Sequence, residues 1–382
     1  MRKVLSEIVS SIFPQRFFNV LSNGTLEEVQ KAIDGGANVN KRYSNGATPL
    51  MWAASNNQNP EVITALIQAG ADVNDRTSSG STPLMAAADN NQNPEVITTL
   101  IKAGAKIDDR TSNGSTPLIC AADHNKNPEI IIVLIKAGAN SNDQNSDGFS
   151  PLMAAAQDNQ NPEVITALLK AGANVNGRNS KGTTPLMFAA GNNQNPEIIM
   201  VLIKAGANID DRTSTGITPL MAAAGNNQNP EVITALIKPS ANIDDLNSNG
   251  RTPLMFAAGN NQNPEIIMVL IKAGANSNDQ NSDGFTPLMD AASNNQNPEV
   301  ITTLIKAGAN IDDRTSDGFT PLMCAAINNQ NPEVITILLK SGADGKLKDN
   351  KGKTAFDYAK DNEHIKGTAQ YWELNDAQYE ER

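Results

Sequence analysis

The tripeptide Thr-Pro-Leu returns every 34 residues through most of this 382-residue chain, beginning at Thr48 and ending at Thr320. Ser150 replaces the threonine in one copy, and a second marker, Asn-Pro-Glu, keeps the same period. Eighteen of the 20 prolines fall in these two registers. A fixed period of this length is typical of stacked units, each of which buries its apolar face only against a neighbouring unit.

Each unit predicts two short helices, as residues 77–110 illustrate. Gly80 lies in the opening turn, in a register that is glycine in every unit and therefore indicates a positive φ angle. Thr82 is the expected N-cap of the first helix, and Pro83 is its first residue, where a missing N–H costs nothing. Asn91 is expected to end this helix in the left-handed conformation.

The second helix of the unit is predicted by the same signals. Asn93 is the expected N-cap and Pro94 the first helical residue. Glu95 in the first turn and Lys102 in the last turn both suit the helix dipole. An apolar stripe with helical spacing runs along it, formed by Val96, Ile97, Leu100 and Ile101.

This pattern resembles the ankyrin repeat, through a Gly-containing turn, Thr-Pro-Leu-x-x-Ala-Ala, and a second helix that ends Leu-Ile-Lys-Ala-Gly-Ala-Asn-Ile-Asp. The resemblance covers about residues 15–375 and implies an all-α, ankyrin-type helical solenoid of stacked helix-turn-helix units with short hairpin-like loops. Two features depart from the family. The period is 34 instead of 33, with the extra residue in the inter-helix turn, and methionine (Met85, for example) replaces the histidine that follows Thr-Pro-Leu.

The repeat pattern divides the chain into five expected segments. Residues 1–14 have the spacing of an amphipathic N-terminal helix, and residues 15–41 resemble a capping repeat without Thr-Pro-Leu. Nine full repeats occupy residues 42–346, a more polar C-terminal cap occupies residues 347–375, and a charged tail expected to fray occupies residues 376–382. Pro239-Ser240 replaces the Ala-Gly that ends the other second helices, so a local bend or simple sequence drift is expected there.

Composition narrows the choice of partner. The formal net charge is −11 and the sequence pI about 4.8, which disfavours nucleic acids and anionic membranes and permits a basic protein partner. No apolar run is long enough to span a membrane. Cys120 and Cys324 lie six repeats apart, on the order of 50 Å at ordinary helix spacing, so they are not expected to pair.

Positions that vary inside the repeat are the candidate binding residues. In the ankyrin family, the hairpin tips and the inner helices line a concave groove where partners usually bind. One variable register lies directly before Thr-Pro-Leu and another directly after the methionine, and the tips add two further apolar residues. The expected partner-binding residues are Tyr43, Trp52, Phe149, Phe188, Ile217, Leu246, Arg251, Phe256, Phe285 and Phe319.

A second interpretation competes with binding at several of these positions. Trp52, Phe188 and Phe256 would equally suit packing between first helices, and an isolated exposed phenylalanine needs no explanation. Aspartates beside the tips form a column that would attract a basic partner or, alternatively, pair with the adjacent arginines as a solvated surface. These aspartates are Asp75, Asp109, Asp143, Asp211, Asp245, Asp279 and Asp313.

No catalytic, cofactor or metal site is predicted. Cys120 and His124 are four residues apart with Asp123 beside them, which superficially suggests a nucleophile with its base. Each of the three is a substitution at a position that other residues fill in sister repeats, and two or three ligands at one helix end do not make a metal site.

The sequence therefore favours a non-catalytic scaffold, monomeric and cytoplasmic, that binds a partner protein of unknown identity. An exported effector that acts on host proteins through the same surface is the alternative. A ligand-binding or hydrolytic protein is the third hypothesis, and it would need a polar pocket that the sequence does not show.

Overall fold

A computed structural model describes residues 17–239 and 241–379, and within these residues every secondary-structure element is a helix. The helix expected over residues 1–14 lies outside the described residues. The N-terminal cap begins with helical residues 17–23 and continues with α2 (Leu26–Asp34). Thr25 and Glu28 form a capping box at the start of α2, each side chain accepting a hydrogen bond from the other's backbone N–H.

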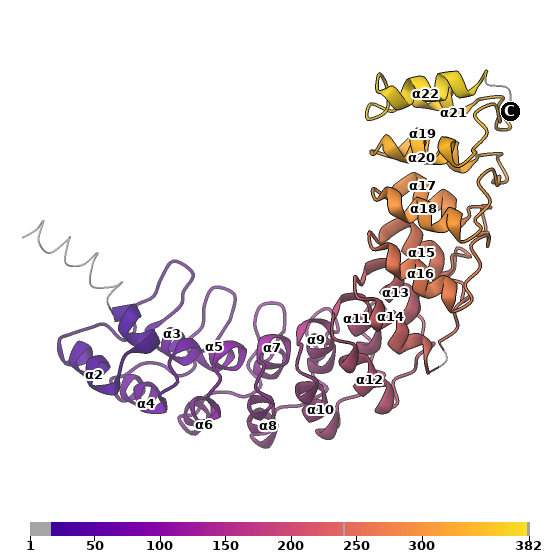
Figure 1. Cartoon of the computed structure of the whole chain (residues 1–382). Helices are drawn as coiled ribbons and strands as arrows, with labels where there is room; N and C mark the ends of the chain where they lie inside the picture. Colours follow the sequence, from indigo (N-terminus) through magenta and orange to yellow (C-terminus); the bar gives the residue numbers. More distant parts are fainter. Residues whose placement is uncertain (1–16, 240, 380–382) are drawn as a thin grey trace, which may run out of the picture. The chain divides into compact units, whose positions relative to one another are not determined.

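Each repeat contributes a first and a second helix (Figure 1). The first helices are α3 (Pro49–Asn56), α5 (Pro83–Asn90), α7 (Pro117–His124), α9 (Pro151–Asp158), α11 (Pro185–Asn192), α13 (Pro219–Asn226), α15 (Pro253–Asn260), α17 (Pro287–Asn294), α19 (Pro321–Asn328) and α21 (Ala355–Ala359). The second helices are α4 (Pro60–Gln68), α6 (Pro94–Lys102), α8 (Pro128–Lys136), α10 (Pro162–Lys170), α12 (Pro196–Lys204), α14 (Pro230–Ile237), α16 (Pro264–Lys272), α18 (Pro298–Lys306), α20 (Glu333–Lys340) and α22 (Ala369–Ala377).

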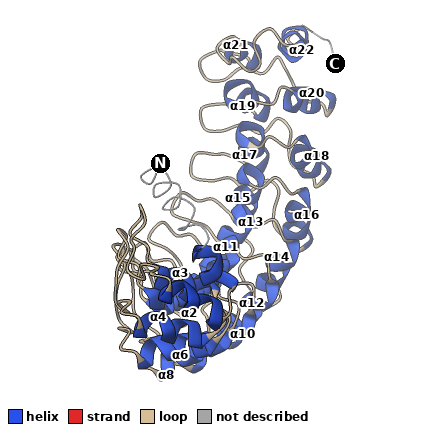
Figure 2. Cartoon of the chain, turned by 90° about the vertical axis from the view of Figure 1, so that its left-hand side faces the viewer, coloured by secondary structure: helices blue, strands red, loops and turns tan. Residues whose placement is uncertain are grey.

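The chain divides into two compact units. Unit 1 runs to Ser180 and includes residues 204–206, and unit 2 comprises residues 181–203 and the chain from Ala207 onwards. In unit 1, each first helix packs on the next from α3 to α9, and the second helices form a parallel row (Figure 1). Figure 2 shows the same two rows in unit 2, from α13 to α21 and from α14 to α22. The expected all-α ankyrin-type solenoid of stacked helix pairs is confirmed.

The helix starts follow the predicted signals. The Thr82 hydroxyl accepts the backbone N–H of Met85, with Pro83 as the first helical residue. The Asn93 side chain accepts the backbone N–H of Glu95 in the same way at the start of α6. These caps satisfy backbone donors that have no partner inside the helix, which explains why each register keeps its residue type.

The core lies between the rows and between repeats. In one repeat, Leu84, Met85, Val96, Ile97 and Leu100 are all buried. Burying an aliphatic side chain of this size contributes about 2 kcal/mol, and none of these residues is covered by its own repeat alone. The alanine pair of each first helix from α3 to α19 is also fully buried, so neighbouring first helices approach closely.

A ladder of buried asparagines joins consecutive repeats. The side-chain amide of Asn91 donates to the carbonyl oxygens of Ala54 and Asn57 in the preceding repeat, at 2.8 Å each. Its Oδ1 accepts the backbone N–H of Asn93 at 2.9 Å. Equivalent bonds recur at Asn57, Asn125, Asn159, Asn227, Asn261, Asn295, Asn329 and Asn362.

The expectation that Asn91 ends the helix in a left-handed conformation is therefore wrong. Its φ and ψ of −74° and 133° are extended, and the side chain is fully buried. The residue is asparagine because two orphan carbonyls and one orphan N–H meet at this point, and one primary amide satisfies all three. The Asn93 amide adds a second inter-repeat bond, to Gln58 O at 2.7 Å, so the longer inter-helix turn is a bonded element of the scaffold.

The loops between repeats are also bonded to each other. Gly80 has a φ of 80°, as predicted, and a Cβ there would lie 3.2 Å from the backbone of Ser112 in the next loop. The backbone N–H of Ser112 donates to Ser79 O at 2.8 Å. Glycine is thus required both for the turn and for the contact between loops.

Helix α14, inside the repeat array, and helix α22, at its C-terminal end, differ slightly from expectation. Helix α14 ends at Ile237, one residue earlier than its sister helices, because Pro239 has no N–H to donate to the last turn. A local bend or sequence drift is expected at Pro239-Ser240, but Ser240 lies outside the described residues. Helix α22 runs to Ala377, two residues beyond the boundary placed at 375. In the described residues, no helix has both the length and the apolar character needed to cross a bilayer.

Candidate functional site

The variable registers lie on the first helices and on the loops between repeats, and we call this surface of each unit the first-helix face. In α13, Leu220, Met221, Ala223 and Ala224 are buried, whereas Ala222, in the variable register, is half-buried. The corresponding residue of α3, Trp52, is exposed. The variable register after the methionine is therefore only partly accessible, since Ala154, Asp290 and Cys324 are buried, while the invariant positions form the core.

The tip phenylalanines are accessible but anchored. Phe149, Phe285 and Phe319 are each half-buried, and the backbone N–H of each is held by a side chain of its own turn. The ring centroid of Phe319 lies 5.6 Å from that of Tyr358 in the C-terminal cap. These rings are partly covered before any partner binds, so each offers one edge or face to an interface.

Tyr43 and Trp52 belong to an aromatic cluster at the N-terminal end of unit 1. The Phe18 ring lies 4.2 Å from the Tyr43 ring and 5.0 Å from the Trp52 ring, centroid to centroid. The Trp52 indole N–H donates to the Ser22 hydroxyl at 2.6 Å. Contacts within the cluster thus cover part of the Tyr43 and Trp52 side chains, although Trp52 remains exposed.

Arg251 and Phe256 are engaged inside unit 2. The Arg251 guanidinium lies 4.7 Å from the centre of the Phe256 ring and 3.0 Å from the carboxylate of buried Asp290. Burial raises the pKa of Asp290, and Arg251 opposes the shift. The Nε of Arg251 is buried and has no hydrogen-bond partner. The arginine therefore compensates an internal carboxylate, which sequence reasoning did not anticipate.

Phe188 and Ile217 line a common pocket in unit 2. Its volume is about 360 Å³, and it opens between α11, α13 and the loop over residues 213–217. The remaining lining residues are Lys181, Thr183, Met187, Gly191, Asn192, Thr213, Ser214, Thr215, Ala222 and Asn226. Both belong to the ten predicted binding residues, so the structure brings this pair to one hollow.

The tip aspartates are largely paired with arginines, but across repeats. Arg110 lies 3.1 Å from Asp143, and Arg212 lies 2.7 Å from Asp245. Arg42 pairs with Asp75 and Arg76 with Asp109 in the same way. The expectation of pairing between neighbours in sequence is therefore corrected: each arginine reaches about 33 residues forward because loops stack at the repeat spacing. Leu246, whose carbonyl accepts Arg212 at 2.7 Å, stays exposed at its tip.

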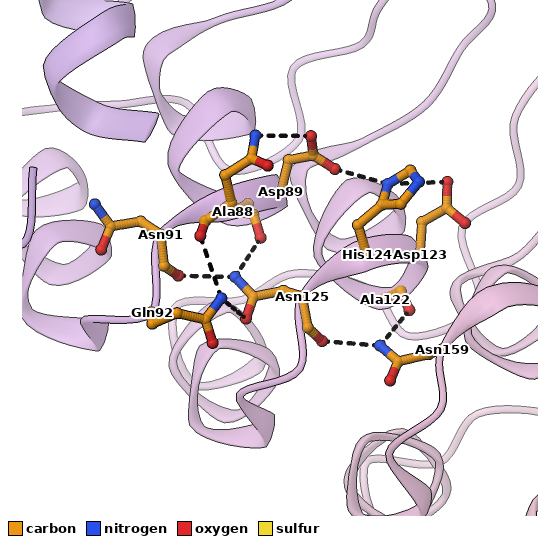
Figure 3. Close-up of polar contacts among 10 residues, drawn as sticks. Ala88, Asp89, Asn91, Gln92, Ala122, Asp123, His124, Asn125 and Asn159 are labelled. Atoms are coloured by element: carbon orange, nitrogen blue, oxygen red, sulfur yellow. Dashed lines mark hydrogen bonds and ion pairs between the residues drawn. The ribbon is translucent and has the colours of Figure 1, made fainter. Parts of the chain in front are cut away.

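A titratable cluster occupies the last turns of the first helices in unit 1. Figure 3 shows the His124 ring between Asp89 and Asp123, with Nδ1 at 2.9 Å from Asp89 and 3.5 Å from Asp123. Burial alone would lower the pKa of His124, and the two carboxylates outweigh it, so the pKa is raised. Burial, with Asp158 and Asp89 nearby, raises the pKa of Asp123.

The same cluster disables the cysteine as a nucleophile. Burial, followed by the charges of Asp89 and Asp123, raises the pKa of the Cys120 thiol to about 12. A reactive cysteine needs the opposite shift, towards the thiolate. Among the described residues, no group of three or more histidine, cysteine or carboxylate side chains has the geometry to hold a metal ion.

Sequence reasoning missed two kinds of surface residue. Met200 and Met268, on the second helices α12 and α16, are exposed because they interrupt the polar side of those helices. Gly191 and Ala222 form the floor of the pocket, and their signal was a change in side-chain size between equivalent positions of sister repeats.

Comparison with known proteins identifies the family. The family model described as ankyrin repeats (3 copies) matches residues 17–111, 84–179, 152–246, 220–315 and 291–369. The chain therefore belongs to the ankyrin repeat family, whose repeats are generally protein–protein interaction modules and are typically not enzymes. A search of curated proteins found no significant match.

Proposed function

We propose that this chain is a non-catalytic scaffold that holds a partner protein on its first-helix face. The observation that carries the proposal is that the variable residues directly before Thr-Pro-Leu, from Ala47 to Phe319, are all partly accessible, whereas the constant Leu and Ala-Ala positions of the first helices are buried. Trp52, Phe188 and Ala222, in the second variable register, are accessible as well. Accessible aromatic side chains on a rigid framework suit the anchors of a protein interface.

The proposal is tested by affinity capture from lysate of the source organism, followed by quantitative mass spectrometry. Wild-type chain is compared with a variant that carries F149A, F285A and F319A, which removes three tip rings. The matched control carries M200A and M268A, which removes exposed apolar side chains from the second helices. Loss of a captured protein with the first variant alone supports the proposal. Equal capture by all three chains, or loss with the control, contradicts it.

A basic partner segment would suit unit 1. Asp89, Asp123 and Asp158 lie at the C-terminal ends of consecutive first helices, where the helix dipoles add negative charge. Such a contact would weaken with salt, because partly exposed charges are screened over about 8–10 Å at physiological ionic strength. Binding of the captured partner at 50 and 500 mM salt, with D89N/D123N/D158N as the comparison, tests this point; a salt-independent affinity would rule it out.

We further propose that the chain acts as a monomer in the cytoplasm, with export as an effector as the alternative. Cys120 and Cys324 are both free thiols, which suits a reducing compartment. The acidic charge makes nucleic acid an unfavourable partner. Fractionation of source cells and their medium, together with light scattering on the purified chain, checks both statements; the protein in the medium, or a mass above 40.5 kDa, would contradict them.

A further inference from the structure

The pocket between α11 and α13 exists because two small residues meet there. Gly191 on α11 faces Ala222 on α13, and a Cβ on Gly191 would lie 3.7 Å from the Ala222 Cβ. In unit 1 the Gly191 position carries Ser55, Asp89, Asp123 or Gln157. Neither α11 nor α13 therefore places a large side chain beside Gly191, and a hollow of about 360 Å³ remains.

The neighbouring helix pair shows what fits such a space. Thirty-four residues further on, Gly225 on α13 takes the place of Gly191, and Phe256 on α15 takes the place of Ala222. A Cβ on Gly225 would lie 3.7 Å from both Cβ and Cδ1 of Phe256, so the phenylalanine covers this glycine. The chain itself fills the equivalent position with an aromatic side chain between α13 and α15, and leaves it empty between α11 and α13.

We propose that the pocket lined by Phe188, Ile217 and Ala222 receives an aromatic side chain from the partner polypeptide. The inference rests on the proposed function and specifies one contact within it. A hollow of about 150 Å³ already holds a benzene ring in other proteins, so the observed volume admits a phenylalanine or tyrosine ring with its adjoining backbone. Phe188 supplies an aromatic wall for edge-to-face or offset contact, and Met187 adds an adaptable thioether.

The rim of the pocket suits a polypeptide that carries this ring. Asn226 offers a side-chain amide at one side and Ser214 a hydroxyl at the other, whereas the Asn192 amide already donates to Phe188 O and the Thr213 and Thr215 hydroxyls bond each other. Amides and hydroxyls both donate and accept, as the backbone of an inserted segment requires. Lys181 is the one charged residue in the lining, so a carboxylate near the aromatic residue is favoured and a lysine or arginine there is disfavoured.

The first test uses the full chain labelled with 13C at its methionine methyl groups. Met187 lines the pocket, and Met153 occupies the equivalent position in unit 1 and reports on unrelated effects. The probes are N-acetyl-phenylalanine amide, N-acetyl-leucine amide and N-acetyl-alanine amide. We expect the phenylalanine probe alone to shift the Met187 signal in a saturable way. No shift up to the solubility limit, or an equal response to the leucine probe, would overturn the aromatic assignment.

A matched pair of variants separates pocket closure from general damage. Ala222→Phe copies the side chain that the chain already accommodates at Phe256, and should abolish the Met187 response while the fold is kept. Ala86→Phe makes the same change at the same repeat position in unit 1, away from the pocket, and should leave the response intact. Thermal unfolding of both variants confirms that each is folded. A response that survives Ala222→Phe in a folded chain contradicts the proposal.

Capture of the partner distinguishes failure of this inference from failure of the proposed function. If Ala222→Phe weakens capture at least tenfold and Ala86→Phe does not, the partner uses the pocket. If Ala222→Phe captures as wild type while the F149A/F285A/F319A variant does not, the partner binds the tips and the pocket inference is overturned alone. If capture is insensitive to every first-helix-face variant, the proposed function falls as well.

Discussion

Asp89 and Asp123 in unit 1 occupy the helix position at which unit 2 carries Gly191, Gly225 and Gly259. The backbone around these positions is the same in both units: proline starts the helix, a threonine hydroxyl caps it and a buried asparagine follows it. In unit 1 the accessible surface is consequently acidic, with a histidine between two carboxylates. In unit 2 the corresponding surface carries a hollow beside Phe188 and an aromatic ring under an arginine.

Different positions of the repeat thus serve stability and recognition. The helix caps, the core and the asparagine ladder are determined by the repeat and do not depend on the unit in which they lie. The first-helix positions that face solvent are free to change, because their side chains cover neither the core nor a backbone polar group. Four predictions follow the comparison from the shared scaffold to the residues specific to each unit.

The asparagine ladder should contribute equally in both units. Asn125→Leu in unit 1 and Asn261→Leu in unit 2 each remove an amide that satisfies two buried carbonyls. We expect each to lower the free energy of unfolding by about 2–5 kcal/mol, because a buried polar group left without a partner costs about 1–3 kcal/mol. Urea denaturation followed by circular dichroism measures both; an effect confined to one unit would show that the two scaffolds are not equivalent.

The two cysteines should be equally unreactive, although they lie in different units. Burial, the largest cause in each case, together with nearby carboxylates, raises the pKa of Cys120 and of Cys324 to about 12. Alkylation by iodoacetamide at pH 8 should be at least about thirtyfold slower in the native chain than in urea, because the thiolate is the reactive form. Mass spectrometry after timed quenching gives both rates, and native labelling of Cys120 as fast as in urea would revive the nucleophile hypothesis.

The contribution of the Arg251–Asp290 pair to the stability of unit 2 should depend on pH. Arg251→Met leaves Asp290 buried without its cation, at a cost of about 1–3 kcal/mol, since the guanidinium is partly exposed. The pKa of Asp290 is already raised by burial, so the folded chain holds the proton more tightly than the unfolded chain. The destabilisation should therefore be large at neutral pH and shrink as pH falls below the pKa of this carboxyl.

Chemical denaturation of wild type, Arg251→Met and Arg251→Met/Asp290→Asn across pH 3–8 gives the profile. The double variant has no buried charge and should recover most of the loss at neutral pH. A penalty in the single variant that is constant with pH would mean that the arginine acts through packing on Phe256 alone.

The His124 contact should give the smallest effect, and only in unit 1. The groups that face the ring are Asp89 on α5, Asp123 on its own helix and Asp158 on α9. Because its folded pKa is raised above the unfolded value near 6.5, the contribution is complete below that value and disappears as pH rises through the folded pKa. The His124→Asn variant should lose at most about 0.5 kcal/mol near pH 6 and nothing near pH 8, since the ring is largely exposed.

Thermal unfolding of wild type and His124→Asn at pH 6 and pH 8 measures this difference. A loss of the same size at both pH values would show that the imidazole acts through neutral hydrogen bonding to Asp89 instead of through charge.

The repeat, the helix pairs and their caps could be predicted from the sequence because each depends on residues within a few positions of each other. Thr82 with Pro83 and Asn93 with Glu95 are such local signals. The role of Asn91 could not be deduced locally, because its amide bonds to carbonyls 34 and 37 residues back. The Arg–Asp pairs between repeats could not be deduced for the same reason, because their partners are 33 residues apart.

The sequence predicted which repeat positions contribute to the candidate site, but it did not predict the shape of the site. Phe188 and Ile217 were identified as variable positions, but the pocket that they line depends on Gly191 and Ala222, 31 residues apart on neighbouring helices. Likewise, nothing near Arg251 in sequence indicates that Asp290 would need it. Packing between repeats decides which accessible side chains remain available to a partner.

Hydroxyl-radical footprinting of the complex with the captured partner shows which helices the partner covers, because exposed reporters lie on both the first and the second helices. Trp52 on α3 is 43% exposed, whereas Met200 and Met268 on the second helices are 52% and 41% exposed. We expect protection of first-helix-face side chains, with Trp52 or Phe188 among them, and unchanged oxidation of Met200 and Met268. Protection of the two methionines with no change on the first-helix face would contradict the proposed function.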